Sequence, residues 1–176
     1  DLYTDSLKKL GSIYGLVNNA ALAYDDLVTN ADITSIKKSF AVNVIAPIIL
    51  SKFAVRDMIL NRVEGSIVHI SSVSTSTGYR GLAMYGSTKG AIEAFSLGMA
   101  REWGRRGIRS NCVAAGFMDT DMTSSLSEDQ KERIYARTGL KQPTEPKSVA
   151  STVVFLLSEE SKSITGEVVR ADSGTL

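Results

Sequence analysis

Short strand-like runs alternate along this sequence with longer segments of helical periodicity. The strand-like runs are rich in β-branched residues and are predicted at residues 13–20, 66–72, 108–114 and 167–171. Helices are predicted over residues 32–60, 85–106 and 144–157, and an opening helix is predicted to end near Gly11. Because parallel strands need long crossovers, this alternation predicts parallel pairing with right-handed connections. We therefore expect an α/β fold, a Rossmann-like doubly wound parallel sheet with helices on both faces.

Local signals refine these boundaries. Pro47 removes a backbone donor inside the segment 32–60, which predicts a kink or local break there. Ser127 and Gln130 have the spacing of a capping box and predict the start of another helix. Pro146 is tolerated in the first turn of the helix at 144–157. The polar stretches 74–84 and 117–127 are predicted to be a loop and an irregular segment.

Length and composition predict one ordinary globular domain, spanning residues 1–176. The chain is 43% hydrophobic and 22% charged, so it can bury a substantial core. Its net charge of +1 gives no electrostatic reason to expect nucleic acid or an anionic membrane as a partner. The longest apolar run, residues 41–50, is broken and too short to span a bilayer. No signal peptide is evident, and the single Cys112 fits a reducing compartment, so a soluble, cytoplasmic protein is expected.

Tyr85 and Lys89 are the strongest candidates for acid–base chemistry. They stand four residues apart on a predicted helix and therefore share one face. An ammonium beside a phenol favours the phenolate, so we expect Lys89 to lower the pKa of Tyr85 toward neutrality. Ser72 ends a predicted strand and could donate a hydrogen bond to the same substrate oxygen. The spacing alone is common on helices, and an exposed tyrosine packed on a lysine stem is the alternative.

Several ordered motifs surround this pair, namely VNNAA, VHISS, YGSTK, MAREWGRRGIRSN, AAGFMDTDM and ITGEVVRADSG. With these motifs in this order, the sequence resembles the short-chain dehydrogenase/reductase family, classical subtype, and most closely its 3-oxoacyl-[acyl-carrier-protein] reductase branch. The resemblance runs from Asp1 to Leu176. It implies an NAD(P)-dependent oxidoreductase that interconverts a carbonyl and a secondary alcohol by hydride transfer. In that branch the substrates are 3-oxoacyl thioesters of fatty-acid biosynthesis.

The resemblance implies a role for each matching residue. Tyr85 is the general acid/base, Lys89 holds the nicotinamide ribose hydroxyls, and Ser72 orients and polarises the substrate carbonyl. Asn43 matches the asparagine that anchors a water in the family's proton relay. The cofactor, NADP or NAD, has further implied contacts with Asn18, the backbone of Met118, and Thr120.

Structural alternatives exist for three of these residues. Asn18 could satisfy backbone groups at a strand end, Asn43 could relieve the break at Pro47, and Thr120 could cap a helix. His69 and Cys112 lie inside predicted strands and are expected to be core residues. Asp119 and Asp121 have no third ligand nearby in the sequence, so no metal site is proposed.

Three positions depart from the family pattern without removing a reacting group. Alanine stands at Ala115, where the family usually has proline, and this change should loosen the turn that presents Met118 and Thr120. Ala21 and Ser173 stand where the family has glycine.

The family binds its nucleotide with a glycine-rich run, Gly-x-x-x-Gly-x-Gly, placed between a strand and a helix. The given sequence contains no such run. Comparison with the family places Asp1 in the helix before the fourth strand. We therefore expect a domain that lacks the family's first three strands and, as given, binds dinucleotide poorly. Whether the family's N-terminal part exists in the protein stays open at this stage.

Small residues on the helix at 85–106 favour close helix packing. In the family, the matching helix lies in the core of a tetramer. The resemblance therefore implies a homo-oligomer, either a tetramer or a dimer. Arg106 matches an arginine that helps dock the acyl carrier protein, although an ordinary solvated charge run is the alternative. A small carbonyl or alcohol compound is the expected substrate. Alternatives are a non-catalytic binding or regulatory protein of the same fold, another alcohol dehydrogenase of the family, and an epimerase or dehydratase.

Overall fold

The computed structural model describes residues 11–120, 123 and 126–175. Its centre is a parallel sheet with strand order β1-β2-β3-β4. The strands are β1 (Gly15–Asn18), β2 (Ser66–Ser72), β3 (Arg109–Ala115) and β4 (Val168–Ala171). The predicted parallel sheet is confirmed, and each strand overlaps the run predicted for it. The helix expected before Gly11 lies outside the described residues.

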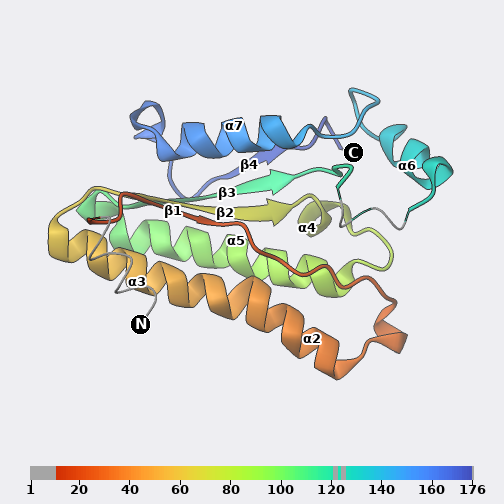
Figure 1. Ribbon diagram of the computed structural model, residues 1–176, viewed down its shortest axis with the longest axis horizontal. Coiled ribbons are helices and arrows are strands. Elements are labelled where there is room, and N and C mark those ends of the chain that lie inside the picture. Colours follow the sequence, from red (N-terminus) through yellow and green to blue (C-terminus); the bar gives the residue numbers. More distant parts are fainter. Residues whose placement is uncertain (1–10, 121–122, 124–125, 176) are drawn as a thin grey trace.

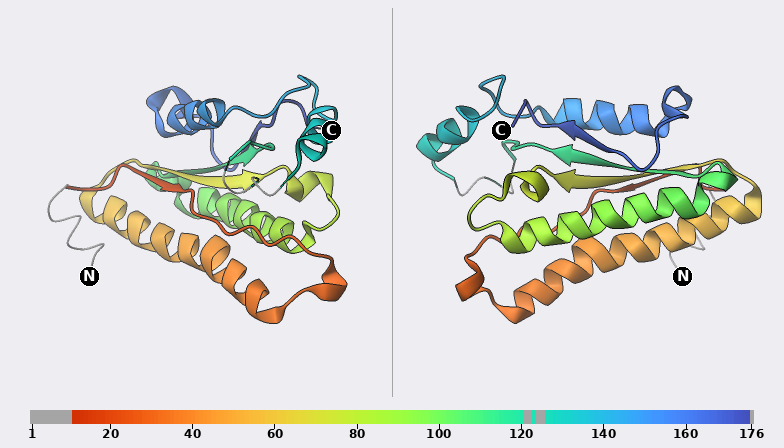
Figure 2. Two further views of the ribbon diagram at one scale, coloured as in Figure 1. Left: turned by 45° about the vertical axis from the view of Figure 1, so that its right-hand side comes forward. Right: turned by 180° about the vertical axis from the view of Figure 1, so that it is seen from behind.

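Helices cover both faces of this sheet, as predicted (Figure 1). One face carries α2 (Ile33–Phe40), α3 (Ala46–Asn61) and α5 (Ala83–Trp103), and α7 (Pro146–Leu157) lies on the other. The short helix α4 (Ser74–Thr77) and α6 (Glu128–Tyr135) lie beyond the carboxyl ends of the strands (Figure 2). Single 3-10 turns occupy η1 (Val28–Asn30), η3 (Gly104–Arg106) and η5 (Glu159–Ser161).

Two hydrophobic clusters hold the layers together, one on each face of the sheet. Alternation along β2 supplies both, because Ile67 packs with α3 and α5 while its neighbour Val68 packs with α7. Met58 and Leu156 are fully buried partners on the two faces. Every residue of β3 is buried, which fits a strand covered by helices on both sides.

The predicted break at Pro47 is confirmed as a π-helical segment, η2 (Ala41–Ile45), between α2 and α3. The Ala46 N–H donates to the Ala41 carbonyl, five residues back. Pro47 has no N–H, so the carbonyl of Asn43 lacks its usual partner and the ladder rearranges.

The run Ile33–Asn61 is nevertheless one continuous helix of 29 residues, and an 18-residue stretch of it has a mean hydropathy of 1.5. By length and composition this helix could cross a membrane, whereas the expectation drawn from residues 41–50 considered a shorter run. This is weak evidence for a membrane span, because a core helix of a soluble protein passes the same test.

The loop predicted over 74–84 was partly wrong, because its first residues form α4. The hydroxyls of Ser76 and Thr77 donate to the Val73 carbonyl at 3.2 and 2.9 Å, which closes a helical turn. Gly78 ends it in the left-handed conformation, at φ 62°. The predicted capping box at Ser127 is confirmed, and the described part of 117–127 contains no named helix or strand.

Candidate active site

Ser72, Tyr85 and Lys89 meet at the carboxyl edge of the sheet. Ser72 is the last residue of β2, and Tyr85 and Lys89 lie in the first two turns of α5, which packs against β2. The Ser72 hydroxyl lies near enough to the Tyr85 phenol to lower the pKa of that phenol. The Lys89 Nζ lies 5.6 Å from the centre of the Tyr85 ring. The structure therefore brings together the three groups that the sequence singles out.

Lys89 is held inside the protein and is only 4% exposed. Its Nζ donates to the backbone carbonyl of Ile70 at 2.7 Å, and burial lowers the pKa of Lys89 to about 8. An ammonium has three N–H donors. Within the described part of the chain only the Ile70 carbonyl accepts from it, which leaves donors for the hydroxyls of a bound ribose. This donor set fits a nicotinamide nucleoside.

The expectation for the pKa of Tyr85 was wrong. Burial raises the pKa of the Tyr85 phenol above its usual value, and the hydrogen bond with Ser72 offsets only part of this rise. The Lys89 ammonium donates one of its N–H groups to Ile70 and is not among the groups that shift the pKa of Tyr85. A phenol in this setting is a proton donor at neutral pH.

Asn43 lies in the π-helical segment and is 2% exposed. Its Oδ1 accepts from the Leu22 N–H at 2.7 Å, and its Nδ2 donates to the Leu22 carbonyl at 2.8 Å. Nδ2 also lies 3.1 Å from the Thr88 Oγ1, beside Lys89. The side chain thus ties the segment after β1 to α5, and none of these hydrogen bonds is made to Tyr85. Any relay through Asn43 stays a prediction.

Asn18 ends β1 and is 8% exposed. Its Nδ2 lies 3.2 Å from the Ser51 Oγ and 3.1 Å from the His69 Nδ1. Its Oδ1 is one of the two buried side-chain polar atoms without a partner among the residues described. The Nδ2 of Asn18 is used inside the protein, and the cofactor contact of Asn18 stays a prediction.

Met118 and Thr120 lie on a turn after β3 that Thr123 organises. The Thr123 Oγ1 donates to the Met118 carbonyl at 2.9 Å and accepts from the Thr120 N–H at 3.0 Å. Thr120 is exposed, and the described helix that follows, α6, is capped by Ser127. Thr123 was missed from the sequence, although Met-x-x-x-x-Thr is a spacing at which a hydroxyl can reach back to a carbonyl.

His69 and Cys112 are fully buried, which confirms them as core residues. Burial and the positive charge of Lys89 lower the pKa of His69 to about 4, so this imidazole is neutral. Burial raises the pKa of Cys112 to about 12. Neither side chain is disposed to exchange protons with a ligand at neutral pH.

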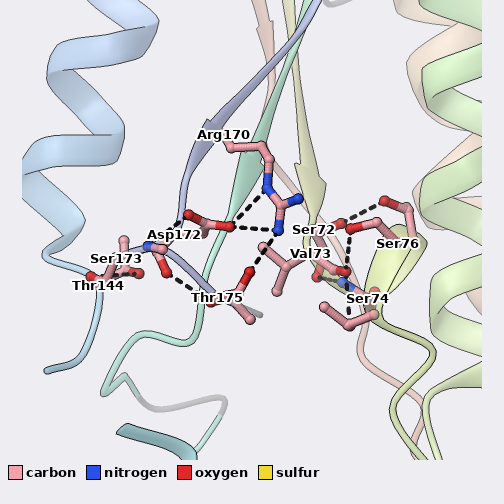
Figure 3. A network of polar contacts seen from close by, with 12 residues as sticks. Ser72, Val73, Ser74, Ser76, Thr144, Arg170, Asp172, Ser173 and Thr175 are labelled. Carbon is pink, nitrogen blue, oxygen red and sulfur yellow. Dashed lines mark hydrogen bonds and ion pairs between the residues drawn. The ribbon is translucent and has the colours of Figure 1, made fainter. Parts of the chain in front are cut away.

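The turn after β4 closes the same edge of the sheet (Figure 3). The carboxylate of Asp172 accepts from the Arg170 guanidinium at 2.8 and 2.9 Å and from the Gly174 N–H at 3.0 Å. Ser173 stands where the family has glycine and adopts the left-handed conformation at φ 56°, which costs a serine some strain. Its hydroxyl lies 3.3 Å from the Thr144 Oγ1, which anchors the residue in place.

Ala115, the position at which proline is usual, lies at the end of β3. It is buried in β3, and its carbonyl accepts from the Val73 N–H at 3.1 Å. The next residue, Gly116, donates its N–H to the Ala171 carbonyl at 3.0 Å. The turn toward Met118 therefore starts from a backbone held on both sides. The effect of alanine on its mobility stays a prediction.

Comparison with known proteins gives consistent results. A family model described as enoyl-(acyl carrier protein) reductase matches residues 1–175. A 3-oxoacyl-[acyl-carrier-protein] reductase of Vibrio cholerae is 34% identical over 94% of this chain and 68% of its own length. Carbonyl reductase family member 4 of Xenopus tropicalis is 36% identical over 99% of this chain and 71% of its own length.

Solved structures agree with these relatives. A gluconate 5-dehydrogenase of Burkholderia cenocepacia, in complex with NADP and tartrate, superposes with a TM-score of 0.93 at 25% identity. The match covers 97% of this chain and 68% of that one. A putative betaketoacyl-ACP reductase superposes at 0.85 with 28% identity, over 99% of this chain and 73% of that one. By its sequence motifs, its parallel sheet and these relatives, the chain belongs to the short-chain dehydrogenase/reductase family.

Proposed function

We propose that this protein reduces a carbonyl compound to a secondary alcohol at the edge of the sheet where Ser72 and Tyr85 meet. The observation that carries the proposal is the closeness of these two hydroxyls, with the Lys89 ammonium buried 5.6 Å from the centre of the Tyr85 ring. The two hydroxyls can bind one substrate oxygen together, and Lys89 retains donors for a cofactor ribose. The cofactor is NAD or NADP, which supplies the hydride when bound.

Each residue then has a defined task. Ser72 donates a hydrogen bond that orients the substrate carbonyl and stabilises the negative charge that develops on its oxygen. Tyr85 donates its proton to that oxygen. The raised pKa of Tyr85 keeps the phenol protonated at neutral pH, which favours reduction over oxidation of an alcohol. Asn43 and Thr88 keep α5 aligned with the segment after β1.

The names of the relatives support a proposal for the substrate class. Named relatives include 3-oxoacyl-[acyl-carrier-protein] reductases and a carbonyl reductase, so 3-oxoacyl thioesters are the proposed substrates. Arg106 lies exposed in η3 and is a proposed contact for an acidic carrier protein. We further propose a homo-oligomer in the cytoplasm. Exposed apolar residues on α3, including Ile49 and Leu50, favour packing against another subunit.

The test is reduction of acetoacetyl thioester by the purified chain, followed as loss of NADPH absorbance. NADPH is supplied up to millimolar concentration, and its binding is measured separately by fluorescence. We expect turnover that depends on both substrates. Cofactor binding without turnover would instead support the non-catalytic alternative.

A further inference from the structure

Glu93 lies on α5, one helical turn beyond Lys89 and two beyond Tyr85. Its Oε1 accepts from the Ser71 Oγ at 2.5 Å and from the Thr75 Oγ1 at 3.1 Å. Ser71 is a buried residue of β2, and Thr75 belongs to α4. One carboxylate oxygen therefore joins the helix of Tyr85 and Lys89 to the strand end and to the short helix that follows.

The residues between these two contacts include Ser72 itself. We call Ser71–Thr75 the serine turn. Inside it, the Ser74 N–H donates to the Ser72 Oγ at 3.2 Å (Figure 3 shows Ser72 and Ser74). The Thr75 Oγ1 lies 2.9 Å from the Ser72 carbonyl oxygen, so the hydroxyl proton of Thr75 is shared between this carbonyl and the Glu93 carboxylate. Ser72 therefore stands in the chain between Ser71 and Thr75, the two residues that donate hydrogen bonds to Glu93.

A second contact sets the distance between α5 and the serine turn. A Cβ added to Gly86 would lie only 3.1 Å from the Ser74 carbonyl oxygen. Gly86 follows Tyr85 directly, so the helix approaches the turn closely beside the phenol and is tied to it again at Glu93. The close approach at Gly86 and the hydrogen bonds of Glu93 thus hold the serine turn against α5 at two points along the helix.

We propose that Glu93 is a positioning residue that holds the Ser72 hydroxyl in register with Tyr85. The inference rests on the proposed function, because it assigns Glu93 to the alignment of that site. Hydroxyls that share one substrate oxygen must be placed within about 0.5 Å, and supporting hydrogen bonds supply such placement. Glu93 touches no reacting atom and acts through Ser71 and Thr75.

The experiment compares four variants of the full chain. Glu93→Leu removes the acceptor at similar volume, and Glu93→Gln retains an oxygen acceptor. Ser71→Ala removes the same hydrogen bond from the strand side and keeps the proposal testable if Glu93→Leu does not fold. Glu102→Leu changes an exposed glutamate of the same helix and is the matched control. Hydrogen exchange of the peptide covering residues 71–77 is measured together with kcat and KM for acetoacetyl thioester.

We expect the amides of residues 74–77 to exchange about tenfold faster in Glu93→Leu and Ser71→Ala, with exchange elsewhere unchanged. We expect kcat to fall about tenfold with KM within about twofold, because placement of Ser72 matters most in the transition state. Glu93→Gln should restore both values, and Glu102→Leu should resemble the wild type.

Two results would overturn the assignment. One is unchanged exchange of the serine turn in both folded variants, and the other is a loosened turn with unchanged kcat. Absence of turnover in the wild-type chain would count against the proposed function instead, and the exchange data alone would then decide whether Glu93 fixes the turn.

Discussion

The ammonium of Lys89 donates a hydrogen bond to the backbone carbonyl of Ile70, 2.7 Å away in the interior. A cation in this position is costly, because a single carbonyl replaces its hydration shell. The cost appears as a pKa of about 8, well below that of a lysine in water. The folded chain therefore holds a destabilised buried ammonium at the place where the hydroxyls of a ribose could accept its remaining N–H donors.

The first prediction concerns the pH dependence of stability. The pKa of Lys89 is lower in the folded chain, so the unfolded chain binds more protons between about pH 8 and 10.5 and stability from this group rises with pH there. Lys89→Met should have its greatest stability relative to the wild type at pH 7. That difference should fall by on the order of 2 kcal/mol by pH 10. Urea unfolding at both pH values measures it, and a difference independent of pH would contradict the assignment.

The second prediction concerns the thiol of Cys112, which is fully buried with a pKa raised to about 12. The reactive species is the thiolate, so the native chain should react with an aromatic disulfide reagent at pH 8 more than roughly a hundredfold slower than the urea-unfolded chain. Comparable rates in the two states would show that β3 is not packed as described.

The third prediction concerns Gly116, which follows β3. A Cβ there would lie 2.3 Å from the Thr144 Oγ1 and 2.6 Å from the Asp172 Cα, and the Asp172 contact is with backbone that cannot yield easily. Gly116→Ala should lower the free energy of unfolding by about 1–3 kcal/mol or more.

The matched control is Gly98→Ala on α5, where an added Cβ meets nothing within 4 Å. Alanine there should be neutral or stabilising by up to about 1 kcal/mol, because glycine disfavours a helix interior. Thermal unfolding compares the two variants. Equal melting temperatures would mean that the turn after β3 has room that the structure does not show.

The sequence predicted the parallel pairing of the strands, the break at Pro47 and the capping box at Ser127, because each follows from local chemistry or from crossover length. It also identified Ser72, Tyr85 and Lys89, which the fold brings to one edge. The pKa of Tyr85 was predicted in the wrong direction. Spacing along a helix shows which residues are neighbours and does not show how deeply the phenol is buried.

Other features depend on contacts between distant segments. The link from Glu93 to Ser71 joins residues 22 positions apart and leaves no spacing signal, apart from the acid's place on the same face as Tyr85 and Lys89. The helix α4 was missed because serine and threonine usually indicate loops. Here their hydroxyls bond to the Val73 carbonyl and close a turn.

The central claim is that Tyr85 donates the proton in carbonyl reduction, and Tyr85→Phe tests it most directly. The variant keeps the ring over Lys89 and removes only the hydroxyl. Tyr14→Phe is the control, because Tyr14 is exposed at the opposite end of the sheet, where its hydroxyl contacts Glu159. The measurement is kcat for reduction of acetoacetyl thioester at saturating NADPH, alongside NADPH binding. We predict that Tyr85→Phe binds NADPH and loses at least about a hundredfold in kcat while Tyr14→Phe retains the wild-type rate. Retention of most of the rate by Tyr85→Phe would contradict the account.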